Sequence, residues 1–242
     1  MRVISCCAAL ALFATTASPT EVGLPVRVAE RLDQAVTPSE PDQFQGSFTM
    51  SATTMVQKPN GKSREDVVFV AVVVNADDGE QTRRLVRYIE NGVDVTEKQR
   101  EEFEQADASR KKKDEGEDDT NFANPFGDTA DLYRFGVPEN LDSEVIVAFE
   151  PAPELADDYN VATGRLAWDP ATLEPKWMEM TAVHAPKPLR TLSIRLEFTP
   201  QGDRVFVSRM VTDGLARVLM IHREFHMDLR FDDIRPADPI LP

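Results

Sequence analysis

The chain has 242 residues, of which 41% are hydrophobic and 29% are charged, a composition typical of a soluble globular protein with a sizeable core. Acidic residues outnumber basic ones, 42 to 27, which gives a formal net charge of -15. A field of that sign repels nucleic-acid phosphates and anionic lipid surfaces, so the composition argues against nucleic acid or direct anionic membrane binding.

The N-terminal sequence is typical of an export signal. Arg2 precedes an apolar run over residues 3–14, and small residues follow up to Ser18. This pattern predicts a cleavable signal peptide over residues 1–18 and a periplasmic or secreted protein, with residues 19–242 as a single domain. A buried N-terminal helix and a lipoprotein signal at Cys6 are the alternatives. Cys6 and Cys7 are the only cysteines, so the mature chain is expected to lack disulfides and thiolate nucleophiles.

A short amphipathic helix is predicted over residues 24–36. Val28, Leu32 and Val36 recur there at helical spacing among charged residues. The segment 37–41 contains two prolines and is expected to end the helix.

From residue 45 the hydrophobic period changes to two, which predicts strands. Asn60-Gly61 favours a tight turn into a return strand at 67–74, which is apolar on both faces and therefore expected to be covered on both. A third strand is predicted at 85–89. The first strand is expected to place one set of side chains on a single face: Phe48, Met50, Ala52, Thr54 and Val56.

A charged insert at about 96–120 follows. Thr96 and Gln99 form a plausible capping box that opens a helix through about Lys113. A basic run at 110–113 is followed by an acidic one at 114–119. The segment is either a solvated helix with a flexible linker or a docking site for a charged partner.

Strands resume after residue 126. They are predicted at 132–135, 145–149, 164–168, 176–183, 191–198 and 205–211, and Asp213-Gly214 is expected to turn the chain into a long last strand, 216–232. Short strands joined by hairpin turns predict a mostly β (α+β) protein with an antiparallel sheet that curls or closes. One side of this sheet is expected to pack against the core and the other to be exposed to solvent.

The sequence shows no constellation for catalysis. His222, Glu224 and His226 share one strand face, but the two histidines are about 13 Å apart and cannot share an ion directly. No nucleophile elbow or glycine-rich phosphate loop occurs. We therefore expect a protein that is not an enzyme, with no catalytic residues, no metal and no cofactor.

Apolar residues on the predicted strands are the more informative signal. They form either an ordinary core or, in part, an open slot for an acyl chain or an apolar partner segment. The residues predicted to line the concave side of the curved sheet are Phe48, Met50, Val68, Val70, Val72, Leu166, Trp168, Leu192, Ile194, Leu196 and Phe198.

Two short motifs complete this pattern. The strand and turn Gly164-Arg165-Leu166-Ala167-Trp168-Asp169-Pro170-Ala171-Thr172, the ending at 231–235 and the order of elements resemble the periplasmic outer-membrane lipoprotein carrier (LolA/LolB-like) superfamily over about residues 24–235. The resemblance implies an unclosed half-barrel that holds a hydrophobic ligand, with helices lidding the cavity. The insert at 96–120 is a departure from that pattern.

The sequence thus predicts a non-catalytic periplasmic binding protein for a lipid or lipoprotein acyl chain, with outer-membrane lipoprotein sorting as the candidate process. Its candidate partners are the hydrophobic ligand or lipoprotein and an envelope protein. The alternative is a ligand-free envelope interaction or stress-sensing module that acts through its surface and charged insert.

Overall fold

The described part of the chain comprises residues 24–40, 43–57, 61–75, 80–110, 125–126, 130–155, 161–185, 187–218 and 221–237 of a computed structural model. The predicted signal peptide over residues 1–18 lies outside it. So do the predicted Asn60 turn position and residues 111–120 of the charged insert.

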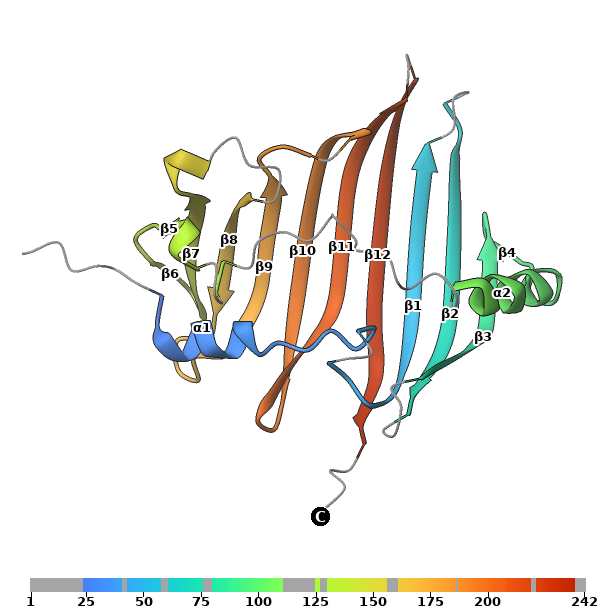
Figure 1. The fold of residues 1–242 in the computed structure, drawn as a ribbon, viewed down its shortest axis with the longest axis horizontal. Helices are drawn as coiled ribbons and strands as arrows, with labels where there is room; N and C mark the ends of the chain where they lie inside the picture. Colours follow the sequence, from blue (N-terminus) through green and yellow to red (C-terminus); the bar gives the residue numbers. More distant parts are fainter. Residues whose placement is uncertain are drawn as a thin grey trace, which may run out of the picture.

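The described residues form one unclosed, mostly antiparallel sheet of twelve strands with two α-helices, as the sequence predicted (Figure 1). The strand order is β4-β3-β2-β1-β12-β11-β10-β9-β8-β7-β5, with β6 paired to β7. The strands are β1 (Gly46–Gln57), β2 (Ser63–Val74), β3 (Gln81–Glu90), β4 (Val93–Asp94), β5 (Tyr133–Phe135), β6 (Glu139–Leu141), β7 (Glu144–Pro151), β8 (Ala162–Trp168), β9 (Pro175–Ala182), β10 (Leu189–Gln201), β11 (Arg204–Val218) and β12 (Ile221–Pro236).

The chain builds the sheet from the middle to one edge and then from the other edge back. Strands β1 to β4 follow one another outward, and β7 to β12 return inward until β12 pairs with β1. The charged insert therefore carries the chain from one edge of the sheet to the opposite edge. It contains α2 (Thr96–Arg110) and leads to the short helix η1 (Ala130–Leu132).

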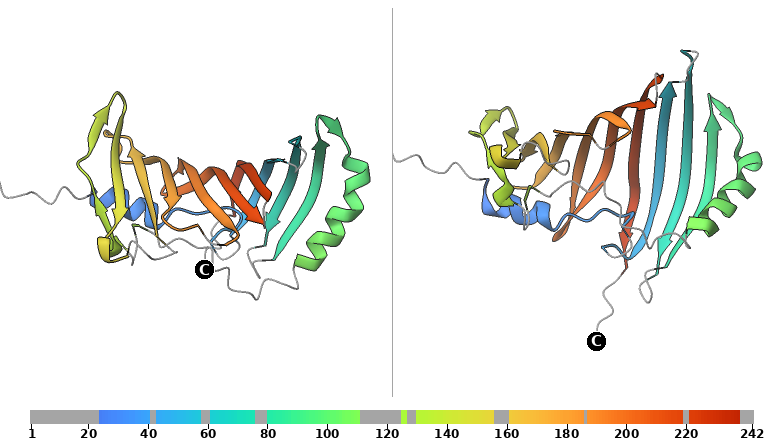
Figure 2. Two further views of the ribbon diagram at one scale, coloured as in Figure 1. Left: turned by 90° about the horizontal axis from the view of Figure 1, so that it is seen from above. Right: turned by 45° about the horizontal axis from the view of Figure 1, so that its top comes forward.

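Both α-helices lie on the same side of the sheet, near opposite ends (Figures 1 and 2). The N-terminal helix, α1, spans Val26–Asp33, shorter than the predicted 24–36, and buries Val28 and Leu32 in the core. On α2, Phe103 packs against the same core and Asp107 lies 4.0 Å from Arg83 of β3. The first half of the insert is thus anchored to the sheet.

The segment after α1 enters a gap in the sheet. The N-terminal part of β11 pairs only with β10, and the C-terminal part of β12 pairs only with β1. Val36 bridges to β11 there, since its N–H donates to the Val205 carbonyl over 2.8 Å and its carbonyl accepts from Val207 over 2.9 Å. Val36 therefore acts as a strand residue, and the predicted helical role for it is wrong.

Two further expectations are corrected. Asp213 and Gly214 lie inside β11 instead of forming a turn, and the predicted strand 216–232 is divided between β11 and β12. A Cβ on Gly214 would lie 2.3 Å from the Phe225 ring, so this glycine serves close packing. The two faces of β2 are also not both covered, because Val73 is 50% exposed.

The side of the sheet away from the helices, here called the polar face, carries a ladder of alternating charges. Arg209 forms two hydrogen bonds of 2.9 Å with Asp228, and Arg165 bonds Glu179 at 2.7 Å. Arg195 lies over the Trp177 ring, 4.7 Å from its centroid. The ladder runs from β8 to β12 through Arg165, Glu179, Arg195, Glu197, Arg209, Asp228 and Arg230.

We predict that this ladder contributes to acid stability through Asp228. Hydrogen bonds from Arg209, opposed by partial burial and helped by Arg230, lower the pKa of Asp228 to about 2. The stabilisation is therefore complete above the unfolded value near 4 and is lost as the pH falls through 2. Asp228→Asn should lower the free energy of unfolding at neutral pH by about 1–2 kcal/mol, and this deficit should shrink between pH 4 and 2.

Urea denaturation across this pH range measures the effect. Asp232→Asn, an exposed position on the same strand, is the matched control and should follow the wild-type profile. A deficit in Asp228→Asn that stays constant down to pH 2 would contradict the prediction.

We also predict that Gly164 cannot accept a side chain. Its Cβ would lie 2.2 Å from the Glu179 carbonyl oxygen and 2.4 Å from the Phe149 ring. Gly164→Ala should therefore destabilise the protein by about 1–3 kcal/mol. At Gly136 the nearest atom would be 3.6 Å away, so Gly136→Ala should change the urea-derived free energy by less than about 0.5 kcal/mol. Equal effects of the two changes would refute this assignment.

Candidate functional site

The face of the sheet that carries the helices, here called the apolar face, is continuous across nine strands. Residues directly opposite one another on neighbouring strands share a face, so the register defines rows of side chains. One row runs from β7 to β3 through Val147, Leu166, Met178, Leu196, Met210, Leu229, Ala52, Val68 and Tyr88. No residue in this row carries a formal charge at neutral pH.

The register brings every predicted lining residue to this face. The buried members are Phe48, Val70, Val72, Leu166, Trp168, Leu192 and Phe198. The half-buried members are Met50, Val68, Ile194 and Leu196. The predicted lining is thus an ordinary core at one part of the face and partly accessible at another.

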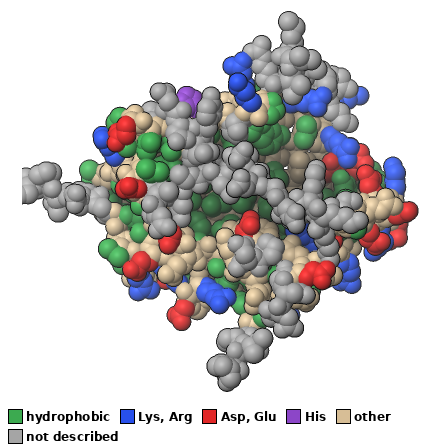
Figure 3. All heavy atoms as spheres, in the orientation of Figure 1, with side chains coloured by type: hydrophobic (Ala, Val, Ile, Leu, Met, Phe, Trp, Pro, Cys, Tyr) green, Lys and Arg blue, Asp and Glu red, His purple; other side chains and the backbone are tan. Residues whose placement is uncertain are grey.

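The accessible part lies toward the centre of the sheet. Met50 of β1, Ile194 of β10, Met210 of β11 and Met227 of β12 are all half-buried. In the view onto this face, hydrophobic side chains are visible on the floor of a hollow (Figure 3). Apolar side chains that keep some solvent exposure over several adjacent strands are typical of a surface that another apolar group covers.

A cavity of about 190 Å³ lies at the α1 end of the apolar face. All of its lining side chains except that of Thr37 are apolar, and they come from α1 and the segment after it, the sheet, and the segment before η1. The lining residues are Leu32, Ala35, Thr37, Pro125, Phe126, Met178, Met180, Leu196, Phe198 and Val207. An apolar cavity of about 150 Å³ can remain dry and bind a ring the size of benzene, so this space suits a short stretch of hydrocarbon.

Ion pairs hold α1 over this cavity. Arg31 bonds the Glu174 carboxylate at 2.8 Å, and the same guanidinium donates to the Asp203 carbonyl. The Arg31 and Glu174 side chains are only 14% and 16% exposed, so the pair is shielded from solvent. Arg27 reaches Glu174 at 3.3 Å but is 60% exposed. The position of α1, and therefore the roof of the cavity, depends mainly on Arg31.

The sequence reasoning missed several residues of this site. Met178 and Met180 lie in a predicted strand, and Leu32 lies in the predicted helix, so their periodicity was a usable signal. Met227 and Leu229 lie in the predicted last strand, 216–232, and alternate there on one face, so the same signal applies to them. Phe126 packs against Phe135 and Phe149 with ring centroids 6.0 Å away, and no local pattern indicated that contact.

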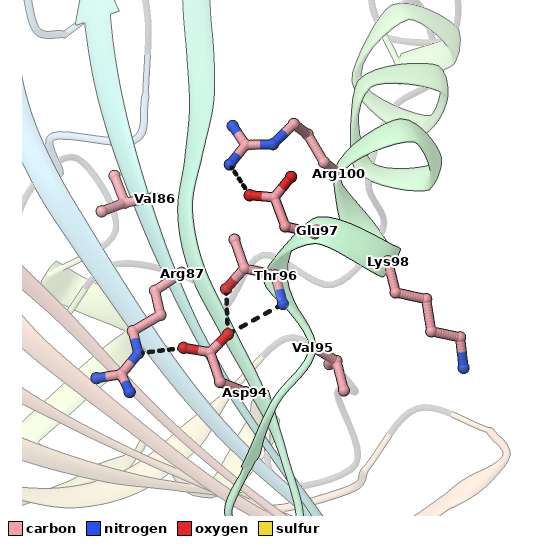
Figure 4. A pocket seen from close by; sticks show the side chains of 8 residues that line it. All are labelled: Val86, Arg87, Asp94, Val95, Thr96, Glu97, Lys98 and Arg100. Carbon is pink, nitrogen blue, oxygen red and sulfur yellow. Dashed lines mark hydrogen bonds and ion pairs between the residues drawn. The ribbon is translucent and has the colours of Figure 1, made fainter.

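A second hollow, of about 620 Å³, lies between β3 and the start of α2 (Figure 4). Asp94 accepts hydrogen bonds there from the Thr96 hydroxyl at 2.6 Å and from Arg87 at 2.9 Å, and these bonds, the Thr96 hydroxyl first, lower its pKa to about 2. The Thr96 hydroxyl also accepts from the Tyr88 N–H, so it ties α2 to β3 instead of capping the helix in the predicted box. Arg100 pairs with Glu97. These charges satisfy one another, and the larger hollow is the weaker candidate.

Of the residues weighed above for metal binding, His226 forms a hydrogen bond with an aspartate. Its Nδ1 lies 2.8 Å from Oδ1 of Asp213 on the polar face. Within the described ranges, no group of three or more histidine, cysteine, aspartate or glutamate residues is placed to hold a metal ion. No helix in the same ranges is long and apolar enough to span a membrane.

Comparisons with known proteins give likenesses of fold. No protein-family model and no curated protein matches the sequence. A LolA superfamily protein from Nitrosomonas europaea is similar at 13% identity and a TM-score of 0.37, over 89% of this chain and 94% of that one. A DUF1329 family protein from Desulfovibrio piger is similar at 12% identity and a TM-score of 0.35, over 86% and 92%.

A MucA/MucB complex from Pseudomonas aeruginosa is a more distant likeness, at 10% identity and a TM-score of 0.20, over 88% of this chain and 100% of that one. The first of these proteins is named for the superfamily that the sequence pattern resembles, and membership of this chain in that superfamily stays a prediction.

We predict that removing Arg31 loosens the roof of the cavity. Arg31→Met keeps most of the apolar stem but removes a shielded ion pair and a bond to a carbonyl, which together contribute about 1–3 kcal/mol. Backbone amides of α1 around Val28 and Leu32 should therefore exchange with deuterium at least about fivefold faster. Arg27→Met, on the same helix but mostly exposed, should leave exchange nearly unchanged. Equal protection in both variants would show that Arg31 does not hold the helix.

Proposed function

We propose that this protein is a non-catalytic periplasmic binding protein that holds an acyl chain of a lipid or lipoprotein on its apolar face. The observation that carries the proposal is the placement of all predicted lining residues on one face, with Met50, Val68, Ile194 and Leu196 still partly accessible. The bound acyl chain would run from the cavity beneath α1 along the central part of the sheet.

The lining suits a flexible hydrocarbon. It is built mainly from side chains without polar atoms, and it includes several methionines, whose unbranched thioethers adapt to ligands of variable shape. A buried polar anchor is not required for such binding, because the free energy comes from removing apolar area from water. Specificity for one head group is therefore not expected from this face.

Burial gives an adequate affinity. Each methylene removed from water contributes about 0.8 kcal/mol, so about twelve contribute roughly 10 kcal/mol. Association costs at least about 4 kcal/mol. The difference corresponds to a dissociation constant of about 10–100 μM for a ligand with one acyl chain. A ligand with a second acyl chain on the same face would bind more tightly. This range suits a carrier that must release its cargo.

The proposed site of action is supported by the N-terminal sequence pattern. The predicted signal peptide over residues 1–18 supports export, and the net charge of -15 favours a protein that diffuses freely instead of adhering to an anionic bilayer. A role in outer-membrane lipoprotein sorting is the process we propose for such a carrier.

The test is binding of dansyl-labelled undecanoic acid to the purified mature protein, followed by fluorescence enhancement. Ile194→Asp places a charge on the apolar face, and Ile194→Trp fills it without adding charge. We expect both to weaken probe binding at least about tenfold, the first because the acyl chain would desolvate a carboxylate and the second because it takes up space.

Thr191→Asp is the matched control, since this exposed residue lies on the same strand and points to the polar face. It should bind the probe like the wild type, and urea midpoints should confirm that all three variants are folded. The proposal fails if the wild-type protein binds no probe, or if the Ile194 variants lose affinity only in proportion to lost stability.

A further inference from the structure

We propose that the methionines of the apolar face form a site of reversible oxidation that switches acyl-chain binding off. This inference rests on the proposed function and adds a regulatory chemistry to the same site. The methionines concerned are Met50, Met180, Met210 and Met227, with Met178 beside them.

The sheet gathers these thioethers into one area although they come from four strands. Met178 and Met210 both lie directly opposite Leu196, and Met210 also lies opposite Leu229. Met180 and Met227 are joined through Ile194 and Thr212 in the next row. Met50 lies one row further on the other side, opposite Val70 and Phe231. A group that approaches this part of the face therefore meets sulfur from several directions.

The same methionines differ in exposure. Met178 is 6% exposed, whereas Met50, Met180, Met210 and Met227 are half-buried. A small oxidant can reach the latter from solvent in the unliganded protein. Cys6 and Cys7 lie outside the described residues, so methionine supplies all the sulfur of the described part of the chain.

The chemistry needs only a peroxide. One oxygen atom of hydrogen peroxide is transferred to the thioether sulfur, the O–O bond breaks, and the peroxide is reduced to water while the sulfur loses two electrons. A methionine sulfoxide reductase reverses the step with a dithiol, which becomes a disulfide as the oxygen leaves in water. Both stereoisomers of the sulfoxide need repair, so two reductase types are required.

Oxidation makes the apolar face more polar, and acyl-chain binding depends on its being apolar. A sulfoxide is a strong hydrogen-bond acceptor, and the residues directly opposite Met50, Met180 and Met210 offer it no side-chain donor. Met227 differs, because it lies opposite the hydroxyls of Thr54 and Thr212. An acyl chain laid across the first three sulfoxides would bury those acceptors unpaired. Conversely, a bound chain would cover the sulfurs and slow their oxidation.

The chain contains its own control. Met55 lies on β1 but points to the polar face, opposite His226, and is 42% exposed. A ligand on the apolar face should not change its reactivity. Met55 therefore separates protection by the ligand from a general effect of the ligand on the oxidant.

The experiment treats the mature protein with limiting hydrogen peroxide, with and without saturating palmitate, and maps sulfoxides by peptide mass spectrometry. We expect the four half-buried methionines to oxidise faster than Met178, and palmitate to slow them at least about threefold while leaving Met55 unchanged. The oxidised protein should bind dansyl-labelled undecanoic acid at least about tenfold more weakly, keep its circular dichroism spectrum, and regain affinity after treatment with both reductase types.

For the variant Met50→Leu/Met180→Leu/Met210→Leu/Met227→Leu, called the Leu variant, probe affinity is compared before and after peroxide treatment. Whatever its starting affinity, peroxide should change it by less than about twofold, since leucine has no sulfur to oxidise. Met55→Leu should remain sensitive. The switch is overturned if oxidised protein binds the probe unchanged, if the Leu variant is equally sensitive, or if oxidation unfolds the protein. If the untreated protein binds no probe, the acyl-chain function itself fails and the switch fails with it, whereas the sulfoxide map still reports which sulfurs the oxidant reaches.

Discussion

The pairing of β1 with β12 is the interaction on which the rest of the structure depends. It joins the first long strand of the chain to the last, so that an outward meander and an inward meander become one sheet. Because Met50 lies opposite Phe231 and Ala52 opposite Leu229, the apolar sides of the two meanders meet on the same face. A slip of one residue at this seam would place the apolar sides on opposite faces and destroy the lining.

The order of strands also accounts for the position of the charged insert in the sequence. Since β4 and β5 are at opposite edges of the sheet, the chain between them has to connect those two edges. The described part of the insert, α2, is anchored to the sheet through Phe103 and Asp107.

Much of the fold could be predicted from local chemistry. Period-two alternation located β1 and β10 and assigned their faces, and the Asp169 turn is seen as expected, with its carboxylate accepting from Ala171 and Thr172. The errors arose where tertiary contacts override local signals. Gly214 was interpreted as a turn residue because glycine favours turns, but here it makes room for a ring from the next strand. Likewise, whether Val36 is helical or bridges β11 depends on a gap between two strands that no local pattern reveals.

The candidate site shows the same division. Which residues line the face follows from periodicity, because alternate residues of a strand share a side. Which of them stay accessible does not, since it depends on where α1 and its Arg31–Glu174 pair lie on the sheet. The buried part of the apolar face supplies most of the stability, because Val28, Leu32 and Phe103 of the two helices pack there against the sheet. The ladder on the polar face adds less, since partly exposed ion pairs contribute little each. The central part of the apolar face can therefore stay accessible because packing around α1 and α2 already holds the sheet.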